Sequence, residues 1–317
     1  MVVNILLLIL GFVLLIKGAD IFVYGASATA RNFKVSKMLI GLTIVAFGTS
    51  APEFAVSMSA LANGNNDMVL GNVIGSCILN ILLILGIAAV IRPLKIKDNT
   101  VKKELPLALL ISTLLAVLLL DNRLGNGMFN QLTRGDAIVI LLFFTVFLYY
   151  LITLAKQKKE EDEKEEKPMK LWKALLFVLL GLGGIVWGSD LVVDNASDIA
   201  KTLGLSERII SLTIIAFGTS LPELVTTIVS SKKGEQDLLL GNIIGSNIFN
   251  ICVVLGVPVA IYGAISPSGF KYIDLAMLVG SALLLFGFSS SKRNISRIEG
   301  IALLVLFAIY YVLVFVI

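Results

Sequence analysis

Two glutamates, Glu53 and Glu223, lie inside long apolar stretches of this 317-residue chain. An ionised carboxylate at that depth in a bilayer is costly unless it is paired or hydrated. Each glutamate follows a proline, Pro52 or Pro222, which removes the backbone hydrogen bond to the carbonyl oxygen four residues earlier. Carbonyl oxygens released in this way persist in a membrane only where something satisfies them, typically a bound cation or cavity water. The two Pro-Glu pairs therefore predict ion binding.

Hydroxyl side chains stand directly before both prolines. Thr49 and Ser50 precede Pro52, and Thr219 and Ser220 precede Pro222. Carboxylate, carbonyl and hydroxyl oxygens together form an all-oxygen set that suits hard cations such as Ca²⁺ and Na⁺ better than soft metals. Each feature also has a purely structural interpretation: a protonated acid between helices, a simple proline kink, or hydroxyls bonded to their own helix. Their joint recurrence favours ion binding.

A second motif occurs twice, as GNVIGSCILN at 71–80 and GNIIGSNIFN at 241–250. Its polar residues are spaced by four, so they share one helix face and could line a path. They are Asn72, Ser76 and Asn80 in the first copy and Asn242, Ser246 and Asn250 in the second. The GxxxG pairs Gly71 and Gly75, and Gly241 and Gly245, predict close helix packing.

The composition places these motifs in a membrane protein. The chain is 57% hydrophobic and 15% charged, with a mean hydropathy of +0.94, whereas soluble domains carry about 25% charged residues. Apolar runs of bilayer-spanning length recur along the sequence. Ten spans are predicted, at 3–27, 38–62, 67–91, 104–121, 135–155, 172–197, 209–230, 237–263, 272–290 and 298–316.

The two copies of each motif are 170 residues apart, which indicates a duplicated unit of five spans. Because five is odd, the second copy must enter the membrane in the opposite sense. The Lys and Arg count agrees: with the N-terminus outside, 20 fall on the inside and 5 on the outside. We expect an all-α membrane protein of ten transmembrane helices in two inverted five-helix repeats, 1–155 and 172–317, joined by a charged cytoplasmic linker at 156–171. Both glutamates would converge at the midplane.

Other features narrow the possible chemistry. Histidine is absent, which removes the commonest transition-metal ligand and the usual proton carrier near neutral pH. The two cysteines, Cys77 and Cys252, lie in apolar segments, so a disulfide framework is not expected. The N-terminal apolar run lacks a preceding positive charge and is interpreted as the first span rather than a secretion signal. Within it, Lys17 is expected to snorkel or to pair with Asp20.

The motifs GTSAPEF and GTSLPEL, each followed by GNxIGSxIxN, resemble the two alpha-repeats of the sodium/calcium exchangers in the cation/calcium antiporter superfamily, above all the compact prokaryotic members. The resemblance covers nearly the whole chain. It implies a central site and gating helices at 3–27 and 172–197. The ligands that it implies are Glu53 and Glu223 for both ions, the carbonyls of Thr49 and Thr219 for calcium, Ser50, Ser220, Ser76, Ser246 and the carbonyls of Ala46 and Ala216 for sodium, and Asn80 and Asn250 at the centre.

The resemblance further implies antiport of three Na⁺ for one Ca²⁺ by alternating access. No cofactor, enzymatic activity or nucleic-acid partner is expected, and the protein should be a monomer in the cell membrane with both termini outside. Some relatives carry Asp at the position of Asn250, including potassium-dependent exchangers, so Asn250 favours potassium independence.

Several alternatives stay open at this point. A proton-coupled or potassium-dependent antiporter would share the fold and the glutamates. A cation channel could use the same oxygens without coupling. An intramembrane hydrolase could use a carboxylate pair, although no Ser/Lys or histidine-based constellation accompanies it here.

Overall fold

A computed structural model describes residues 2–120, 131–156, 169–204, 216–266 and 272–316. It is almost entirely helical and divides into two compact units. The first unit is Met1–Pro52 with Leu154–Asn242, and the second is Glu53–Thr153 with Ile243–Ile317. Each unit therefore draws on both predicted repeats. Most of the predicted linker, 157–168, lies outside the described residues.

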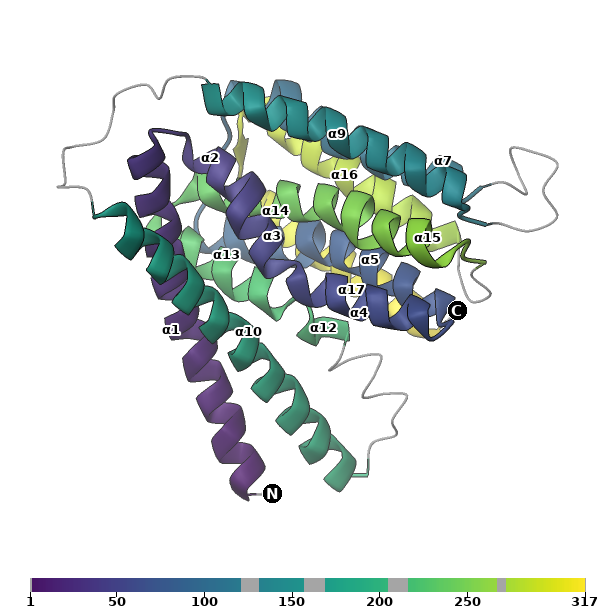
Figure 1. The fold of residues 1–317 in the computed structure, drawn as a ribbon, viewed down its shortest axis with the longest axis horizontal. Helices are drawn as coiled ribbons and strands as arrows, with labels where there is room; N and C mark the ends of the chain where they lie inside the picture. Colours follow the sequence, from purple (N-terminus) through teal and green to yellow (C-terminus); the bar gives the residue numbers. More distant parts are fainter. Residues whose placement is uncertain (1, 121–130, 157–168, 205–215, 267–271, 317) are drawn as a thin grey trace. The chain divides into compact units, whose positions relative to one another are not determined.

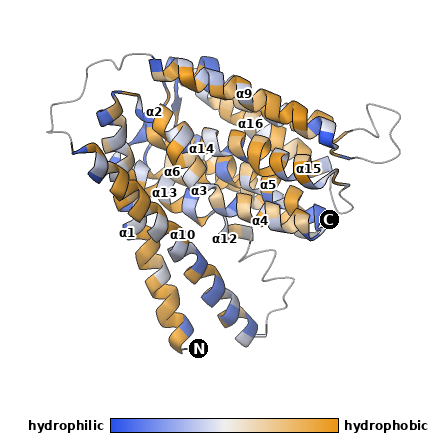
Figure 2. Cartoon of the chain, viewed as in Figure 1, coloured by the Kyte–Doolittle hydropathy of each residue, from blue (hydrophilic) through white to orange (hydrophobic). Residues whose placement is uncertain are grey.

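Seven helices of the described residues are long and apolar enough to cross a membrane, and a bent helix pair at Lys37–Thr49 and Ala51–Ala62 makes up to eight. Most of α9 (Arg134–Lys156) is coloured hydrophobic in Figure 2. Two predicted spans correspond to shorter helices, α7 (Leu105–Leu118) and α13 (Leu221–Lys233). The predicted residues 121 and 209–215 lie outside the described ranges, so the count of ten stays a prediction.

The first unit is built around two long antiparallel helices, α1 (Val2–Phe33) and α10 (Leu171–Thr202), which lie side by side in Figure 1. Glycines set their separation. A Cβ atom added at Gly18 would lie 2.8 Å from the backbone nitrogen of Ile185, and one added at Gly181 would lie 2.5 Å from that of Phe22. Gly11 and Gly25, seven residues to either side of Gly18, make equally close contacts. Small residues thus bring the two backbones together, as they do in membrane helix pairs.

The remainder of the first unit carries the hydroxyl-rich motifs. It contains α2 (Lys37–Ile40), a π-helical turn η1 (Gly41–Val45), α3 (Ala46–Thr49), α12 (Ala216–Gly218), α13 and the first half of α14 (Gln236–Phe249). Gly41 and Gly241 face each other, because a Cβ added at either would lie 2.9 Å from the Cα of the other. The predicted packing role of Gly241 is confirmed by this contact.

The second unit is a helical bundle whose core consists of aliphatic side chains such as Leu82, Ile84 and Leu85. Gly86 packs against α17 at Gly300, since a Cβ added at Gly300 would lie 2.9 Å from the carbonyl oxygen of Gly86. Its elements are α4 (Ala51–Ala62, from Glu53), α5 (Asn66–Leu79), η2 (Asn80–Ile84), α6 (Leu85–Ile91), η3 (Thr100–Glu104), α7, α9, the end of α14, η5 (Asn250–Leu255), α15 (Gly256–Tyr262), α16 (Tyr272–Lys292) and α17 (Arg297–Val316).

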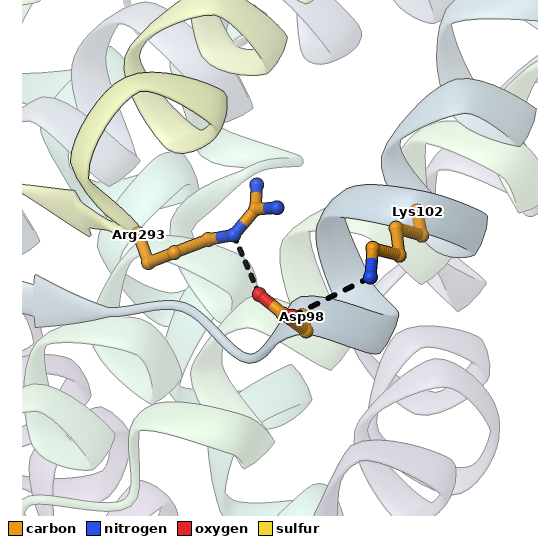
Figure 3. Close-up of polar contacts among 3 residues, drawn as sticks. All are labelled: Asp98, Lys102 and Arg293. Carbon is orange, nitrogen blue, oxygen red and sulfur yellow. Dashed lines mark hydrogen bonds and ion pairs between the residues drawn. The ribbon is translucent and has the colours of Figure 1, made fainter.

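Two short antiparallel contacts connect loops of the second unit. Strand β1 (Leu94–Lys95) pairs with β2 (Asn294–Ile295), and Leu132 forms an isolated bridge with Ile265. Beside the first contact, Arg293 donates to Asp98 over 2.6 Å and Lys102 lies 3.5 Å from the same carboxylate (Figure 3). The hydrogen bond from Arg293 is the main reason that the pKa of Asp98 is lowered.

Local backbone conformations recur 170 residues apart. The helix break before each Pro-Glu pair has the same geometry, with φ −86° and ψ 7° at Ser50 and φ −91° and ψ 5° at Ser220. The left-handed turn that follows has φ 72° at Gly64 and 75° at Gly234. Since equal sequence motifs adopt equal conformations in both halves, the duplication extends to the backbone.

The structure leaves one expectation open and corrects another. A Cβ added at Gly71 or Gly75 would meet no atom within 4 Å in the described part of the chain, so close packing at this GxxxG pair stays a prediction. Asp20 pairs with Lys233, at 3.0 Å, rather than with Lys17. Lys233 ends α13, and no sequence spacing indicates that this end reaches the middle of α1.

Candidate cation-binding site

In the first unit, Glu223 is 1% exposed and lies in the first turn of α13. The Ser50 hydroxyl, at the break after α3, donates to Oε1 of Glu223 over 2.9 Å. The second oxygen, Oε2, is buried without a hydrogen-bond partner among the described residues. Because a buried carboxylate oxygen needs a donor or a cation, Oε2 is available as a ligand.

Thr49 adds a second contact between the two motifs. Its hydroxyl lies 3.1 Å from Oδ1 of Asn242 and 3.1 Å from the carbonyl oxygen of Val45. It has one proton for these two acceptors. The amide nitrogen of Asn242 lies 3.5 Å from the Thr227 hydroxyl, at the outer limit of a hydrogen bond. First-repeat hydroxyls therefore meet second-repeat polar groups around Glu223.

In the second unit, Glu53 is 0% exposed. Asn72 supports its helix: the Asn72 amide donates to the carbonyl oxygen of Glu53 over 3.0 Å and to the Ser57 hydroxyl over 2.9 Å. Asn72, which was expected to line a path, thus uses its donors to connect α5 to α4. This hydrogen-bonding fixes the backbone that carries the Glu53 carboxylate.

A group of unpartnered buried polar atoms lies in the same unit. Within the described residues, no hydrogen-bond partner is present for Oδ1 of Asn80, Oγ of Ser246, or either amide atom of Asn250. All three side chains are at most 1% exposed. Both asparagines begin π-helical turns, η2 and η5, and π-bulges are frequent at functional sites. Buried polar atoms without partners indicate a place where a ligand binds.

The carbonyl oxygens released by the prolines have different surroundings. The Gly218 carbonyl, four residues before Pro222, accepts a hydrogen bond from the Ser189 hydroxyl of α10 over 2.9 Å. The carbonyl oxygen of the predicted ligand Ala46 keeps its helical donor, the Ser50 backbone N–H at 3.0 Å, and the Thr49 hydroxyl lies 3.5 Å from the same oxygen. A helix of the predicted gate thus satisfies one released carbonyl.

The other predicted ligands lie on the same elements. Ser220 is 1% exposed at the break before α13, and Thr219 is half-buried beside it. Ser76 is buried on α5, and Ala216 begins α12. The described residues contain no group of three or more His, Cys, Asp or Glu side chains placed to hold a metal. The oxygens around each glutamate are accordingly those of hydroxyls and amides.

Two residues around these clusters were not singled out from the sequence. Ser189 lies in an apolar helix and belongs to neither motif. Pro222 leaves the Gly218 carbonyl without its helical donor, which indicates that another group must satisfy it, and the structure shows that this group is Ser189. Asn247 is 4% exposed and hydrogen-bonds to Asn80 over 3.0 Å. The sequence distinguishes this residue only by a difference between the two motif copies: the second copy has Asn247 where the first copy has Cys77.

Apolar helices of membrane-spanning length around buried glutamate, hydroxyl and amide groups define a class: a multi-pass membrane transport protein for small hydrated ions. The family model described as sodium/calcium exchanger protein matches residues 3–153 and 173–316. The chain therefore belongs to the sodium/calcium exchanger family.

Individual relatives match over their full length. The putative antiporter CaxA of Alkalimonas amylolytica is 42% identical, covering 99% of both chains. The sodium/calcium exchanger MaX1 of Methanosarcina acetivorans is 32% identical, again over 99% of both. Among solved structures, the sodium-calcium exchanger NCX_Mj, soaked with Na⁺ and without Ca²⁺, superposes with a TM-score of 0.85 at 35% identity over 98% of each chain.

Proposed function

We propose that this protein exchanges Na⁺ for Ca²⁺ across the cell membrane by alternating access, with three Na⁺ for one Ca²⁺. The observation that carries the proposal is the buried carboxylate of Glu223, which accepts the Ser50 hydroxyl and keeps one oxygen without a partner among the described residues. Membership of the sodium/calcium exchanger family and the likeness to NCX_Mj support it.

The chemistry of the ligands accounts for the exchange. Glu53 and Glu223 give a charge near −2 when both are ionised, which one Ca²⁺ neutralises. Na⁺ is also a hard cation and competes for the same carboxylate, hydroxyl and amide oxygens. Because occupancy by one ion excludes the other, alternating exposure to the two sides couples their fluxes. We propose the same twelve ligand residues that the sequence predicts.

The repeat supplies the second half of the proposal, ten spans in two inverted repeats. The matching breaks at Ser50 and Ser220 support a duplication. The loop contacts of the second unit support its inversion: Leu94–Ile295 joins the loops after predicted spans three and nine, and Leu132–Ile265 joins those after spans four and eight. In the repeat, the loop after span three corresponds to the loop after span eight, and the loop after span four corresponds to the loop after span nine. The repeat relation therefore converts each of these two contacts into the other. Both termini would lie outside, and the protein would act as a monomer.

Potassium independence rests on Asn250. Its amide is 0% exposed and carries no charge, and neither amide atom has a hydrogen-bond partner in the described residues. A carboxylate at this place would add a third negative charge, enough for a further monovalent cation. The neutral amide offers one oxygen without that charge, which suits a site loaded by Ca²⁺ or Na⁺ alone.

The proposal is tested with purified protein in liposomes. Vesicles loaded with Na⁺ are diluted into Na⁺-free medium containing ⁴⁵Ca²⁺, with K⁺ absent from both sides. We expect uptake that requires internal Na⁺ and that falls to background in Glu53→Gln and in Glu223→Gln. Glu299→Gln is the matched control, because the Glu299 carboxylate caps α17 through Ser296, outside both clusters.

The same vesicles separate the rival functions. Uptake driven by a pH gradient without Na⁺ would replace the proposal with proton coupling, and uptake that requires K⁺ would replace it with a potassium-dependent antiporter. In a separate arm with K⁺ present, electrogenic exchange predicts faster uptake when valinomycin and a K⁺ gradient make the vesicle interior positive, because one net positive charge leaves the vesicle for each Ca²⁺ that enters. Calcium entry that is indifferent to internal Na⁺ would contradict the exchange.

A further inference from the structure

Asn247 stands at the centre of a short hydrogen-bond chain in the second unit. Its side-chain nitrogen Nδ2 donates to the carbonyl oxygen of Cys77 over 3.3 Å. Its side-chain oxygen Oδ1 accepts from Nδ2 of Asn80 over 3.0 Å. The Cys77 thiol in turn donates to the Asn247 carbonyl over 3.8 Å. Cys77 and Asn247 are 170 residues apart, so a residue here contacts its own repeat counterpart.

The direction of this chain is fixed by its first member. A backbone carbonyl oxygen accepts hydrogen bonds and cannot donate, so the Asn247 side chain must turn its NH₂ group toward Cys77. Its oxygen then faces Asn80. Asn80 must present its own NH₂ group to that oxygen, because two amide oxygens facing each other would repel.

This arrangement determines where the side-chain oxygen of Asn80 points. With its NH₂ group held by Asn247, the Asn80 side chain must direct Oδ1 elsewhere. That oxygen is buried and has no hydrogen-bond partner among the described residues, in a side chain that is 1% exposed. An amide oxygen offered in this way is a ligand for a hard cation, whereas a flipped amide would turn two N–H donors toward the ion.

The repeat counterpart shows what happens without this chain. Asn250 corresponds to Asn80, and the residue that corresponds to Asn247 in the first repeat is Cys77, whose thiol cannot orient an amide in the same way. In the described residues, both amide atoms of Asn250 are without partners. Asn80 is thus held in one orientation, and Asn250 is not.

We infer that Asn247 is a positioning residue that fixes the Asn80 amide so that its oxygen faces the transported cation. The inference rests on the proposed function, since it takes Asn80 as an ion ligand. Groups that orient a metal ligand typically change metal affinity by about 10- to 100-fold when they are removed. We therefore expect Asn247→Leu, which keeps the size and removes the amide, to weaken Ca²⁺ binding about tenfold or more.

An aspartate at position 80 provides the decisive comparison. A carboxylate presents an oxygen whichever way it turns, so it needs no orientation by a neighbour. In the Asn80→Asp background, Asn247→Leu should leave Ca²⁺ affinity unchanged or improve it, because the oxygen of Asn247 opposes a carboxylate there. Asn247→Cys copies the residue of the first repeat and serves as a second variant where the leucine prevents folding.

The experiment measures Ca²⁺-dependent thermal stabilisation and ⁴⁵Ca²⁺ uptake for the wild type, the Asn247 variant, Asn80→Asp and the double variant. The set is made once with Asn247→Leu and once with Asn247→Cys. The expected result is a raised apparent Kd and KM for Ca²⁺ in the single Asn247 variants, with little change in the maximal rate, and no such rise on Asn80→Asp. Equal losses in both backgrounds would mean that Asn247 acts by packing and would overturn the inference alone. A wild-type protein that neither binds Ca²⁺ nor exchanges it would overturn the proposed function and the inference together. Ser112→Ala controls for the loss of a buried hydrogen bond elsewhere in this unit.

Discussion

The Ser50 hydroxyl donates to the Glu223 carboxylate over 2.9 Å, across a sequence separation of 173 residues. The serine belongs to the first GTSxPE motif and the glutamate to the second. The acid of one repeat is therefore supported by the hydroxyl that stands three residues before the acid of the other. Any change at Ser50 acts on Glu223 as well as on its own motif.

Ser50→Ala tests this contact. A hydrogen bond to a charged group contributes about 1.5–3 kcal/mol, and this one holds the Glu223 carboxylate in the orientation that leaves Oε2 for an ion. We expect apparent Ca²⁺ affinity to fall by about tenfold, one factor of ten for each 1.4 kcal/mol. The measurement is the dependence of Na⁺-driven ⁴⁵Ca²⁺ uptake on Ca²⁺ concentration.

Ser112→Ala is the control for Ser50→Ala. Its hydroxyl is also buried but donates to its own helix, at the Ala108 carbonyl, over 2.9 Å. Unchanged uptake in this variant would show that a missing buried hydroxyl does not by itself slow exchange. Full affinity in Ser50→Ala would contradict a role of the Ser50–Glu223 contact in ion binding.

The glycine contact between α1 and α10 predicts a steric effect. Gly18→Ala would place a Cβ 2.8 Å from the Ile185 nitrogen and 2.9 Å from the Gly181 carbonyl oxygen, so the helices must separate. Overpacking of this kind costs about 1–3 kcal/mol. We expect a lower melting temperature in detergent and slower exchange.

Gly183→Ala on α10 is the matched control, because a Cβ there meets no atom within 4 Å in the described residues. It should keep the wild-type melting temperature or raise it slightly, since alanine favours helix. Equal melting temperatures in Gly18→Ala and Gly183→Ala would contradict the close packing of α1 on α10.

Much of the local structure could be predicted from the sequence, whereas the residues that each polar side chain contacts could not. Apolar length and the Pro-Glu pairs predicted buried acids on broken helices, and both glutamates are at most 1% exposed. The partner of Ser50 could not be predicted, because spacing along one helix does not say which second helix packs against it. Asn72 illustrates the same limit: it shares a face with Asn80, yet its amide bonds to the neighbouring helix at Glu53 and Ser57.

Asp98 makes stability depend on pH. Its hydrogen bond and charge interaction with Arg293 lower its pKa below the ordinary value of 3.8 (Figure 3). A group whose pKa is lower in the folded state stabilises the fold above its unfolded pKa and loses that contribution as the pH falls through the folded one. Asp98→Asn should therefore lower the melting temperature at pH 7, with the difference shrinking progressively as the pH falls below 3.8.

The comparison is made by thermal unfolding of both proteins between pH 7 and pH 3. Because Asp98 is exposed, we expect a small difference, of the size seen for other surface ion pairs. A difference between the two proteins that stays constant over this range would mean that Asn changes stability by another route, and Arg293→Gln should then behave differently from Asp98→Asn.

The pair Asp20–Lys233 connects the middle of α1 to the end of α13, with Nζ also donating to the Asp20 carbonyl over 2.8 Å. The repeat counterpart of Lys233 is Asn63, which carries no charge, so the residue at the matching position of the other repeat cannot form this ion pair. Lys233→Gln should loosen α1, seen as faster hydrogen exchange around Asp20, by about fivefold or less for a partly exposed pair. The double reversal Asp20→Lys with Lys233→Asp should restore slow exchange, and persistent fast exchange would contradict the charge interaction.

Ser189→Ala tests how the carbonyl released by Pro222 is held. The Ser189 hydroxyl is the donor to the Gly218 carbonyl, and a buried carbonyl left without a donor costs about 1–3 kcal/mol. The repeat counterpart of Ser189 is Ala19, so the substitution makes the two helices alike at this position. We expect α10 to be held less firmly to α12, with faster hydrogen exchange in α10 and an altered Na⁺ dependence of uptake. Ala19→Ser is the reciprocal variant, and equal hydrogen exchange in wild type and Ser189→Ala would show that the hydroxyl does not hold α10 in place.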